Sequence, residues 1–372
     1  MARMMGEMAL RFPERALVVS TGAYEGSAAS DARFPQVIDR VGIRATRLRT
    51  VQGLMMWTLH AGALAKRWRP DFTWCAELKP AGYPARWLAA RHHVPYGLIV
   101  HGTELLLIQE KIRRSEFKRG TAVSIMGNAA VIVANSNSTA NLALDVLTAL
   151  DLAVPVESVP LGTTPSEFRP GVDTSAVRAK YGLNGGPWLL TVARLEWHKG
   201  IDVVMKAMPQ IRAAHPTARY AVVGTSERLP QFEQLQRDLG LGDAVRFLGL
   251  VSDAELPAIY NAADLYVGAS RRVELLVEGF GISLVEAAAC GLAVVGGRSG
   301  GVPDAVLEGE TGMLVDSDDP AAVAAGINEL LSNPARRKQL GASGRRAVEQ
   351  YYNWDRVVKD LIDIDQRYRV GM

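Results

Sequence analysis

The stretch from Glu278 to Glu286 (EGFGISLVE) combines two carboxylates, two glycines and the start of an apolar segment. The apolar residues before it, Ala263–Ala269, predict a buried parallel strand, and those after it predict a helix that ends before Gly291. Glycines let backbone N–H groups approach a ligand at a helix N-terminus, where the dipole favours anions and hydroxyl oxygens. Glu278, in the loop, can reach such hydroxyls. Glu286, inside the helix, needs a diol or a basic group to justify a buried charge, and two vicinal hydroxyls fit a ribose.

Two cations flank the turn that follows another apolar segment. Arg194 and Lys199 lie between the expected strand Trp188–Ala193 and a helix that begins near Gly200. An arginine can donate two hydrogen bonds to phosphate oxygens, a lysine supplies a point charge, and a glycine permits a tight turn. Arg194, Lys199 and Gly200 together can therefore bind a diphosphate. The alternative is that both side chains are solvated loop residues. Together with the acidic stretch at the same edge of one sheet, they predict a nucleoside diphosphate site with a ribose partner.

A single histidine follows an apolar strand in the first half of the chain. His101 ends the run YGLIVH and precedes Gly102, which puts it at the C-terminal end of an expected strand, where ligands of parallel sheets bind. A histidine in this position either contacts a ligand or is a structural residue. The other five histidines have no spacing typical of metal ligands, so no metal site is predicted.

Basic residues gather in two segments of the first half, interleaved with Trp68, Ile112 and Phe117. Such clusters favour contact with an anionic membrane or an acidic acceptor, and the alternative is a solvated helix face. The first cluster is Lys66, Arg67 and Arg69, and the second is Lys111, Arg113, Arg114, Lys118 and Arg119.

These residues need a scaffold of strands and helices, and the sequence supplies it twice. Short apolar segments alternate with segments of helical spacing, which predicts α/β domains with parallel sheets between helices. The stretch Pro155–Pro170, rich in Pro, Ser and Thr, is the expected domain boundary. The expected strands are Ala16–Thr21, Phe72–Cys75, Tyr96–His101, Ala130–Ala134, Trp188–Ala193, Arg219–Val223, Ala244–Leu248, Ala263–Ala269 and Leu292–Val295. The expected helices include Met1–Phe12, Val51–Trp68, Ala81–His92, Glu104–Arg119, Thr139–Leu150, Ile201–Ala214, Leu229–Leu239 and an almost wholly helical tail, Asp319–Tyr368, with breaks near Asn333 and Asn353.

Size and composition are those of an ordinary globular protein with two domains. The chain has 372 residues, which is long enough to bury two hydrophobic cores. Its residues are 48% hydrophobic and 22% charged. Residues 1–160 carry 19 Lys and Arg against 13 Asp and Glu, and the remainder carries 23 against 26. This mild difference in charge favours contact of the first half with a surface over nucleic-acid binding. No apolar stretch reaches the roughly 18 residues of a membrane span. Cys75 and Cys290 are expected to be buried thiols, and the protein is expected to be cytoplasmic, at most peripheral at the inner face of the membrane.

The run Glu278–Glu286 resembles the E-x7-E motif of retaining glycosyltransferases of family 4, which have the GT-B architecture of two facing Rossmann-like domains. The resemblance is most specific in the second half and leans toward the phosphatidylinositol mannosyltransferase-like branch. It implies an acceptor-side domain at residues 1–160, a nucleotide-sugar-binding domain at 161–352, and a final helix, 353–372, that packs back on the first domain. The supporting matches are Val192–Leu195 with Lys199-Gly200, Phe247–Gly249 before Asp253, Ser299–Pro303, Thr311-Gly312, and Pro160–Thr163 with Phe168 and Pro170 as the linker.

The resemblance implies a role for each charged candidate. Arg194 and Lys199 would hold the donor diphosphate, and Glu286 would accept the ribose hydroxyls. Glu278 would bind hydroxyls of the transferred sugar, and His101 would reach that sugar near the reacting face, so that His101 and Glu278 are the residues nearest the chemistry.

The remaining positions carried over from the family line the rest of the donor. The backbone at Phe280, Gly281 and Ile282 would contact sugar and phosphate, while Val251 and Asp253 would lie against the nucleobase. The implied chemistry retains the anomeric configuration and uses no metal and no cofactor besides the nucleotide sugar. Arg194 and Lys199 then take the place of Mg²⁺ on the leaving group. The favoured path is front-face attack, in which the departing phosphate takes the acceptor's proton.

The chain departs from the family pattern at its start, where members open with a strand and a Gly-Gly loop. Here the first segment has the character of the helix after that loop, and neither Gly6 nor Gly22 lies in the right context to replace it. Two explanations stay open: the natural start lies upstream, or the protein works without that strand, which leaves the first sheet incomplete with an exposed edge. The segment Arg271–Val277 before Glu278 is insertion-like and is expected on the acceptor side.

The sequence therefore favours an enzyme that moves a hexose from a nucleotide sugar to a lipid, glycan or small hydroxylated acceptor. GDP-mannose is favoured over other GDP-, UDP- or ADP-sugars only through the branch resemblance. Two other classes stay open. One is a sugar-nucleotide epimerase or phosphorylase of the same architecture, and the other is a non-catalytic nucleotide-sugar-binding paralogue or subunit.

Overall fold

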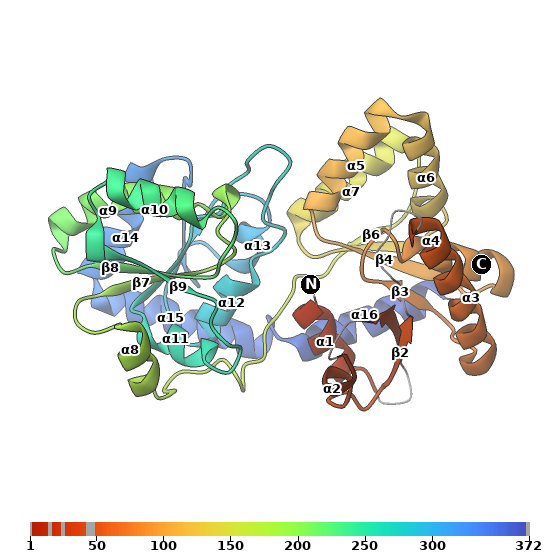
Figure 1. Cartoon of the computed structure of the whole chain (residues 1–372), viewed down its shortest axis with the longest axis horizontal. Coiled ribbons are helices and arrows are strands. Elements are labelled where there is room, and N and C mark those ends of the chain that lie inside the picture. Colours follow the sequence, from red (N-terminus) through yellow and green to blue (C-terminus); the bar gives the residue numbers. More distant parts are fainter. Residues whose placement is uncertain (1, 14–16, 24–26, 42–48, 370–372) are drawn as a thin grey trace. The chain divides into compact units, whose positions relative to one another are not determined.

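The computed structural model of the chain describes residues 2–13, 17–23, 27–41 and 49–369 (Figure 1). These residues fall into two compact units: Met1–Val159 with Trp354–Met372, and Pro160–Asn353. Met1 and Ala16, with which two expected elements begin, and residues 370–372 of the expected final segment lie outside the described residues.

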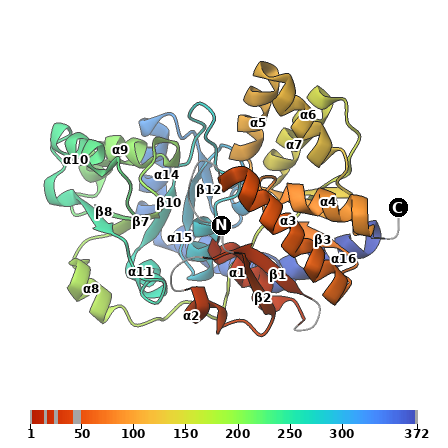
Figure 2. The ribbon, with the colours of Figure 1, turned by 45° about the vertical axis from the view of Figure 1, so that its right-hand side comes forward.

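The first unit contains a four-stranded parallel sheet in the order β3-β4-β5-β6, and β1 and β2 form a separate parallel pair (Figure 2). The central strands β4 and β5 are fully buried, as their unbroken apolar sequences require, whereas β1 and β2 are mostly half-buried. The strands are β1 (Val18–Gly22), β2 (Val37–Val41), β3 (Thr73–Cys75), β4 (Tyr96–Val100), β5 (Val131–Ala134) and β6 (Val156–Ser158).

The helices of the first unit pack against these sheets and against one another. The last helix, α16, packs on α1, and the Tyr368 hydroxyl donates a hydrogen bond to Glu157 in β6 at 3.0 Å. The helices are α1 (Ala2–Arg11), α2 (Ser27–Asp31), α3 (Arg49–Trp68), α4 (Gly82–His92), α5 (Thr103–Arg114), α6 (Glu116–Met126), α7 (Asn137–Leu150) and α16 (Trp354–Tyr368).

Two expectations for this unit need correction. The single helix expected over Glu104–Arg119 is two helices, because Ser115 has an extended backbone (φ −155°, ψ 116°) and its hydroxyl caps the N-terminus of α6. The strand expected at Ala16–Thr21 does not join the main sheet. It pairs instead with β2, whose sequence VIDRV is too polar to stand out as a strand.

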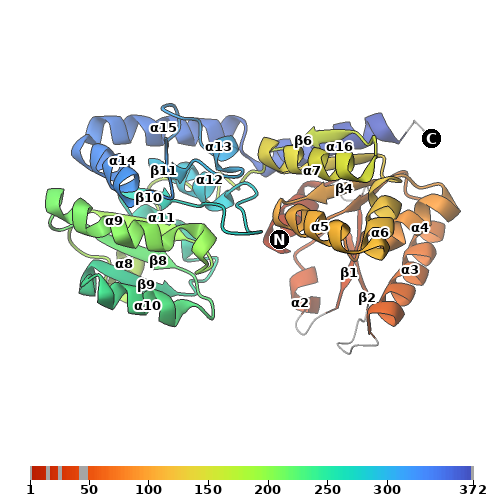
Figure 3. The same ribbon diagram turned by 90° about the horizontal axis from the view of Figure 1, so that it is seen from above.

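The second unit contains one six-stranded parallel sheet, in the order β12-β11-β10-β7-β8-β9, with helices on both faces (Figure 3). Helices α9 and α14 pack together over one face, and α12 and α15 over the other. The strands are β7 (Trp188–Val192), β8 (Arg219–Val223), β9 (Val245–Gly249), β10 (Leu265–Gly268), β11 (Val294–Gly297) and β12 (Met313–Val315). The helices are α8 (Ser175–Tyr181), η1 (Trp197–Lys199), α9 (Ile201–Ala214), α10 (Leu229–Asp238), η2 (Gly242–Ala244), α11 (Leu256–Ala262), α12 (Ile282–Ala289), α13 (Val302–Ala305), α14 (Pro320–Ser332) and α15 (Pro334–Gln350).

Gly200 sets how closely the turn after β7 approaches the end of β10. Its backbone is left-handed (φ 70°), and a Cβ at this position would lie 1.8 Å from the carbonyl oxygen of Ala269. Only glycine satisfies both conditions. The turn that carries Lys199 is therefore held against the segment that leaves β10.

Candidate functional site

In the sheet of the second unit, the order in which the chain adds strands reverses between β7 and β10. From β7 the chain adds β8 and β9 on one side, and it then returns to place β10, β11 and β12 on the other. In parallel α/β sheets, ligands bind beyond the C-terminal ends of the strands at such a switch point. The turn with Lys199 follows β7 and the loop to Glu278 follows β10, so both lie at this edge of the sheet.

Lys199 and Glu278 form an ion pair at the switch point. Lys199 Nζ lies 2.5 Å from Glu278 Oε2, and each side chain is only 17% exposed. The Ser270 hydroxyl donates to the same carboxylate oxygen at 3.2 Å. Burial raises the pKa of Glu278, but the charge and hydrogen bond of Lys199, helped by His198 and Ser270, bring it below the ordinary value. The pair is a charged ammonium and a charged carboxylate held together, mostly away from water.

Arg194, the second predicted cation, lies five residues before Lys199 in the same β7–α9 connection. Its side chain is exposed, and no ion pair joins it to another residue in the described part of the chain. Its positive charge is close enough to lower the pKa of His198. The connection thus presents one exposed guanidinium and one largely buried ammonium before the N-terminus of α9, which suits an anion.

His198 is a residue of this connection that the sequence did not single out. It is buried, and burial, followed by the charge of Lys199, lowers its pKa to about 4, so the imidazole is neutral at physiological pH. Its Nδ1 atom has no hydrogen-bond partner among the described residues. Adjacency to Lys199 was the signal available in the sequence, but a histidine without metal-ligand spacing gave no reason to choose it.

The loop that carries Glu278 is fixed by the turn at Gly300 and Gly301. The N–H of Gly301 donates to the Glu278 carbonyl oxygen at 2.9 Å, and a Cβ on Gly300 would lie 2.3 Å from that oxygen. This glycine turn has an architectural role. The structure shows which architecture it serves: it holds the backbone of Glu278.

The predicted positions Phe280, Gly281 and Ile282 lie at the start of α12. The Phe280 ring is buried 6.2 Å from the ring of Tyr352, so only the backbone of this residue can face a ligand. Gly281 is the N-cap of α12, no side chain caps the helix there, and Ile282 is its first residue. A helix N-terminus without a side-chain cap suits an anionic or hydroxylated ligand.

Glu286 lies in the second turn of α12 and is buried, with 7% of its surface exposed. The Tyr260 hydroxyl donates to its Oε2 atom at 2.7 Å. Burial, and then the charge of Glu286, raise the pKa of Tyr260 far above its usual value, so this tyrosine stays a hydrogen-bond donor. Tyr260 supplies a neutral partner for the buried carboxylate, which the sequence alone did not reveal.

Val251 and Asp253, the residues predicted to lie near a nucleobase, follow β9 at the edge of the sheet. β9 is two strands from β7, so about 10 Å separates the ends of these strands. Both residues therefore follow the C-terminal end of an outer strand of the sheet that carries the Lys199–Glu278 pair.

His101 belongs to the first unit, directly after β4. Its backbone N–H donates to Glu104 Oε1 at 2.6 Å, and its Nε2 lies 2.9 Å from the carbonyl oxygen of Ala76. A carbonyl can only accept, so Nε2 carries the proton and a neutral His101 has Nδ1 as its acceptor. Glu77, which the sequence did not single out, lies nearby, and its pKa is raised by burial and by Glu104.

The described part of the chain contains neither a metal-binding cluster nor a membrane-spanning helix. No group of three or more His, Cys, Asp or Glu side chains there is arranged to hold a metal ion. None of its helices combines the length and the apolar character that crossing a membrane requires.

Comparison with known proteins connects this geometry to a family. Residues 173–347 match the family model described as "Glycosyl transferases group 1". Over 202 residues the chain is 36% identical to the GDP-mannose-dependent alpha-(1-6)-phosphatidylinositol monomannoside mannosyltransferase of Mycolicibacterium smegmatis, which covers 54% of this chain and 53% of that protein. Over 272 residues it is 35% identical to D-inositol 3-phosphate glycosyltransferase 1 of Catenulispora acidiphila, covering 69% and 63%. The alignments thus span about half to two thirds of the curated relatives' own length.

Solved structures extend the likeness in fold to almost the whole chain. Anabaena HepE in complex with UDP-glucose superimposes with a TM-score of 0.80 at 18% identity, covering 98% of this chain and 96% of that one. A glycosyltransferase from Rickettsia africae gives 0.80 at 17% identity, covering 100% and 95%. At these identities the likeness shows the fold alone.

The fold is that of the GT-B class, as the sequence resemblance indicated. The second unit belongs to the glycosyl transferases group 1 family, and the curated relatives confirm the phosphatidylinositol mannosyltransferase-like branch.

Proposed function

We propose that this protein transfers a hexosyl group from a nucleoside diphosphate hexose to a hydroxyl of an acceptor, with retention of the anomeric configuration. The observation that carries the proposal is the Lys199–Glu278 pair at the switch point of the second unit. A nucleotide sugar joins a diphosphate, which attracts a cation, to a hexose, whose hydroxyls donate to a carboxylate. Lys199 and Glu278 are in contact, so a donor that bound to both would have the bond between its diphosphate and its hexose at this pair.

In the proposed reaction the bond between the anomeric carbon and the phosphate oxygen breaks, and the acceptor oxygen bonds to that carbon on the same face. The acceptor's proton passes to the departing phosphate oxygen. Lys199 and Arg194 offset the charge that builds on this phosphate, as preorganised cations do in sites of low dielectric. Glu278 has a lowered pKa and is therefore ionised at neutral pH, ready to accept hydrogen bonds from hexose hydroxyls.

The other candidate residues would contact the rest of the donor. Glu286 would accept the ribose hydroxyls while Tyr260 continues to donate to its Oε2 atom. The backbone of residues 280–282 would contact sugar and phosphate at the start of α12, and the nucleobase would extend toward Val251 and Asp253. His101 would keep its Nε2 proton on the Ala76 carbonyl oxygen, which leaves Nδ1 to accept a hydrogen bond from a sugar hydroxyl.

For the donor we take GDP-mannose, and for the acceptor a lipid-linked polyol. The support is that relatives at 35–36% identity are named GDP-mannose-dependent mannosyltransferases acting on phosphatidylinositol monomannoside. The neighbours of like fold from Anabaena bind UDP or UDP-glucose, but their identity of 18% transfers no base preference.

A panel of nucleotides and sugar nucleotides tests the proposal. We expect saturating GDP and GDP-mannose to raise the thermal unfolding midpoint by about 5 °C or more, and UDP- and ADP-sugars to raise it less. We also expect mannose transfer to phosphatidylinositol monomannoside. An absence of any nucleotide shift would contradict the proposal. Donor binding without transfer would instead favour a non-catalytic binding protein, and epimerised or phosphorolysed donor would favour the other enzyme classes.

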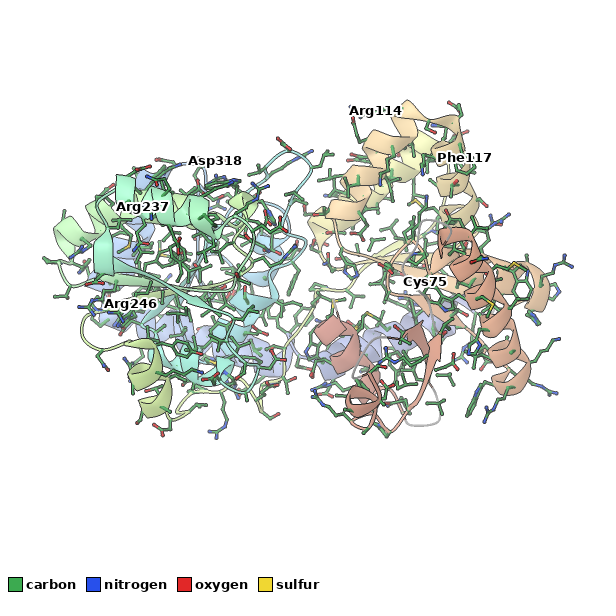
Figure 4. The ribbon with its side chains drawn as sticks, viewed as in Figure 1. Cys75, Arg114, Phe117, Arg237, Arg246 and Asp318 are labelled. Atoms are coloured by element: carbon green, nitrogen blue, oxygen red, sulfur yellow. The ribbon has the colours of Figure 1, made fainter. Side chains whose placement is uncertain are left out.

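We also propose that the first unit contacts anionic lipid, with α3 as the main element. Helix α3 exposes Val51, Met55 and Leu59, which share one helix face and are 77%, 63% and 56% exposed. Lys66 and Arg67 are exposed in its last turn, and the side chain of Arg67 lies over Trp68. An apolar stripe followed by cations is typical of a helix that lies in a membrane interface. Figure 4 shows Arg114, from the second basic cluster, and Phe117, which is interleaved with that cluster, at the α5–α6 corner.

Vesicle binding checks this surface. We expect the protein to sediment with phosphatidylglycerol vesicles and much less with phosphatidylcholine vesicles, and Met55→Gln with Leu59→Gln to weaken that binding at least roughly tenfold. Leu144→Gln, an exposed leucine on α7 that is 48% exposed, is the matched control. Equal binding of the double variant and the control would exclude α3 as the membrane contact.

A further inference from the structure

The three residues that follow β10 lie between the two halves of the candidate site. The Ala269 carbonyl is packed against Gly200, next to Lys199, and the Ser270 hydroxyl donates to Glu278. On the other side the Ser317 hydroxyl donates to the Ser270 carbonyl oxygen at 3.0 Å. The segment is thus held on both sides before the chain reaches Arg271.

Arg271 makes two contacts to the Lys199 turn and the start of α9, and a third to Asp318, which follows β12. Its backbone N–H donates to the carbonyl oxygen of His198 at 2.8 Å. Its Nη2 donates to Oδ2 of Asp202 in the first turn of α9 at 3.0 Å, and its Nε lies 3.5 Å from Oδ1 of Asp318. The Arg271 side chain is 15% exposed, and Asp202 is almost fully buried.

The ion pair with Arg271 stabilises the buried carboxylate of Asp202. Its carboxylate is buried at the N-terminus of α9, and its other partner, Lys206, is a side chain 46% exposed at 3.2 Å. A buried carboxylate without a well-placed cation is strongly destabilising. Removing the guanidinium would therefore disturb the first turn of α9, three residues after Lys199.

The loop beyond Arg271 closes on itself before it reaches Glu278. Val273 and Leu276 exchange backbone hydrogen bonds at 3.0 and 2.9 Å, so the insertion-like segment closes on itself as a tight hairpin before Glu278. Arg271 and Glu278, at the two ends of this loop, both contact the β7–α9 turn.

From these contacts we infer that Arg271 is a positioning residue, which sets the place of Lys199 relative to Glu278 through Asp202 and the His198 carbonyl. The inference rests on the proposed function, because it assigns Arg271 to the alignment of diphosphate and hexose. Arg271 does not touch the donor in this scheme. Its hydrogen bonds go to protein groups, and its effect falls on the geometry of the reacting bond.

The consequence is a split between binding and turnover. Arg271→Gln keeps the charges of Lys199 and Arg194, so the dissociation constant of bare GDP should change less than about threefold. Alignment is lost, and small displacements of reacting groups cost large factors in rate, so kcat for transfer should fall roughly 30- to 100-fold. Arg272→Gln is the matched control, because Arg272 is the exposed neighbour and its Nε donates to the Glu274 carbonyl oxygen within the same loop.

A double-variant cycle separates positioning from stability. Asp202→Asn alone should lower kcat as Arg271→Gln does, and the two together should lower it no further than either one, since both remove the same link. The double variant, free of the unpaired buried carboxylate, should regain most of the lost thermal stability while kcat stays low. Arg271→Lys keeps the positive charge but loses the planar guanidinium that donates to two carboxylates, so it should recover kcat only in part.

The outcomes separate this inference from the proposed function. If Arg271→Gln turns over like Arg272→Gln, or if kcat recovers fully together with stability in the double variant, the positioning role is wrong while the transferase stands. If losses from Arg271→Gln and Asp202→Asn multiply in the double variant, the proposed link is also wrong. If the wild-type protein transfers no sugar, the proposed function and this inference fall together.

Discussion

Replacing Lys199 by methionine should weaken the binding of bare GDP about 10- to 100-fold, measured by calorimetry. A hydrogen bond to a charged phosphate group contributes about 1.5–3 kcal/mol, and methionine keeps the length of the side chain without the charge. Transfer should fall further, by roughly 10²- to 10³-fold in kcat, because the phosphate gains charge as the glycosidic bond breaks. This is one of the two largest effects that the site predicts.

The same substitution should change the pH dependence of stability. In the wild-type protein the pKa of Glu278 is lowered, so the pair stabilises the fold above the ordinary carboxyl pKa and loses that contribution as the pH falls through the lowered value. Without Lys199, burial leaves the ionised carboxylate unfavourable. The stability deficit of Lys199→Met should therefore be largest at neutral pH, about 3 kcal/mol, and shrink in acid.

Lys180→Met is the matched control for Lys199→Met. Lys180 pairs with Glu255 at 2.7 Å in the same unit, but its side chain is 57% exposed, so its loss should leave GDP affinity and unfolding near wild type. Unchanged GDP affinity in Lys199→Met would show that Lys199 does not bind the diphosphate.

Glu278→Gln should separate sugar chemistry from nucleotide binding. The amide is isosteric but uncharged, so Lys199 loses its ionic partner and is freer to approach a phosphate. Bare GDP should therefore bind as tightly as to the wild-type protein, or more tightly. The kcat of transfer should fall by about 10²-fold or more, because the charged acceptor of the hexose hydroxyls is gone.

Glu274→Gln is the control for Glu278→Gln, since it makes the same chemical change at an exposed position of the same loop. It should leave both GDP affinity and kcat near wild type. Equal losses of GDP binding and transfer in Glu278→Gln would reassign Glu278 from the hexose to the nucleotide.

Most strands and helices could be predicted because their periodicity is strong. Arg219–Val223 and Ile201–Ala214 have the predicted bounds, and the breaks at Asn333 and Asn353 in the helical tail are confirmed. Three strands were missed for a common reason: each is short or polar and takes its conformation from a neighbouring strand. These are β2 (Val37–Val41), β6 (Val156–Ser158) and β12 (Met313–Val315).

The acidic and basic parts of the candidate site could be brought together from the sequence, since the C-terminal ends of parallel strands share one edge of a sheet. Which groups pair there could not, because Lys199 and Glu278 are far apart in sequence and meet only through the order β10-β7. Tyr260 beside Glu286, and Asp202 beside Arg271, depend on side-chain packing and carry no periodic signal.

The central claim is that the Lys199–Glu278 pair receives one nucleotide sugar across its two charges. The most direct measurement is a crystal structure of the protein with GDP-mannose, or with the nucleotide sugar that gives the largest thermal shift. The account predicts the diphosphate within hydrogen-bond distance of Lys199 Nζ, and hexose hydroxyls within that distance of the Glu278 carboxylate. A nucleotide sugar bound elsewhere, with the 2.5 Å contact between Lys199 and Glu278 intact and no ligand atom near either residue, would contradict it.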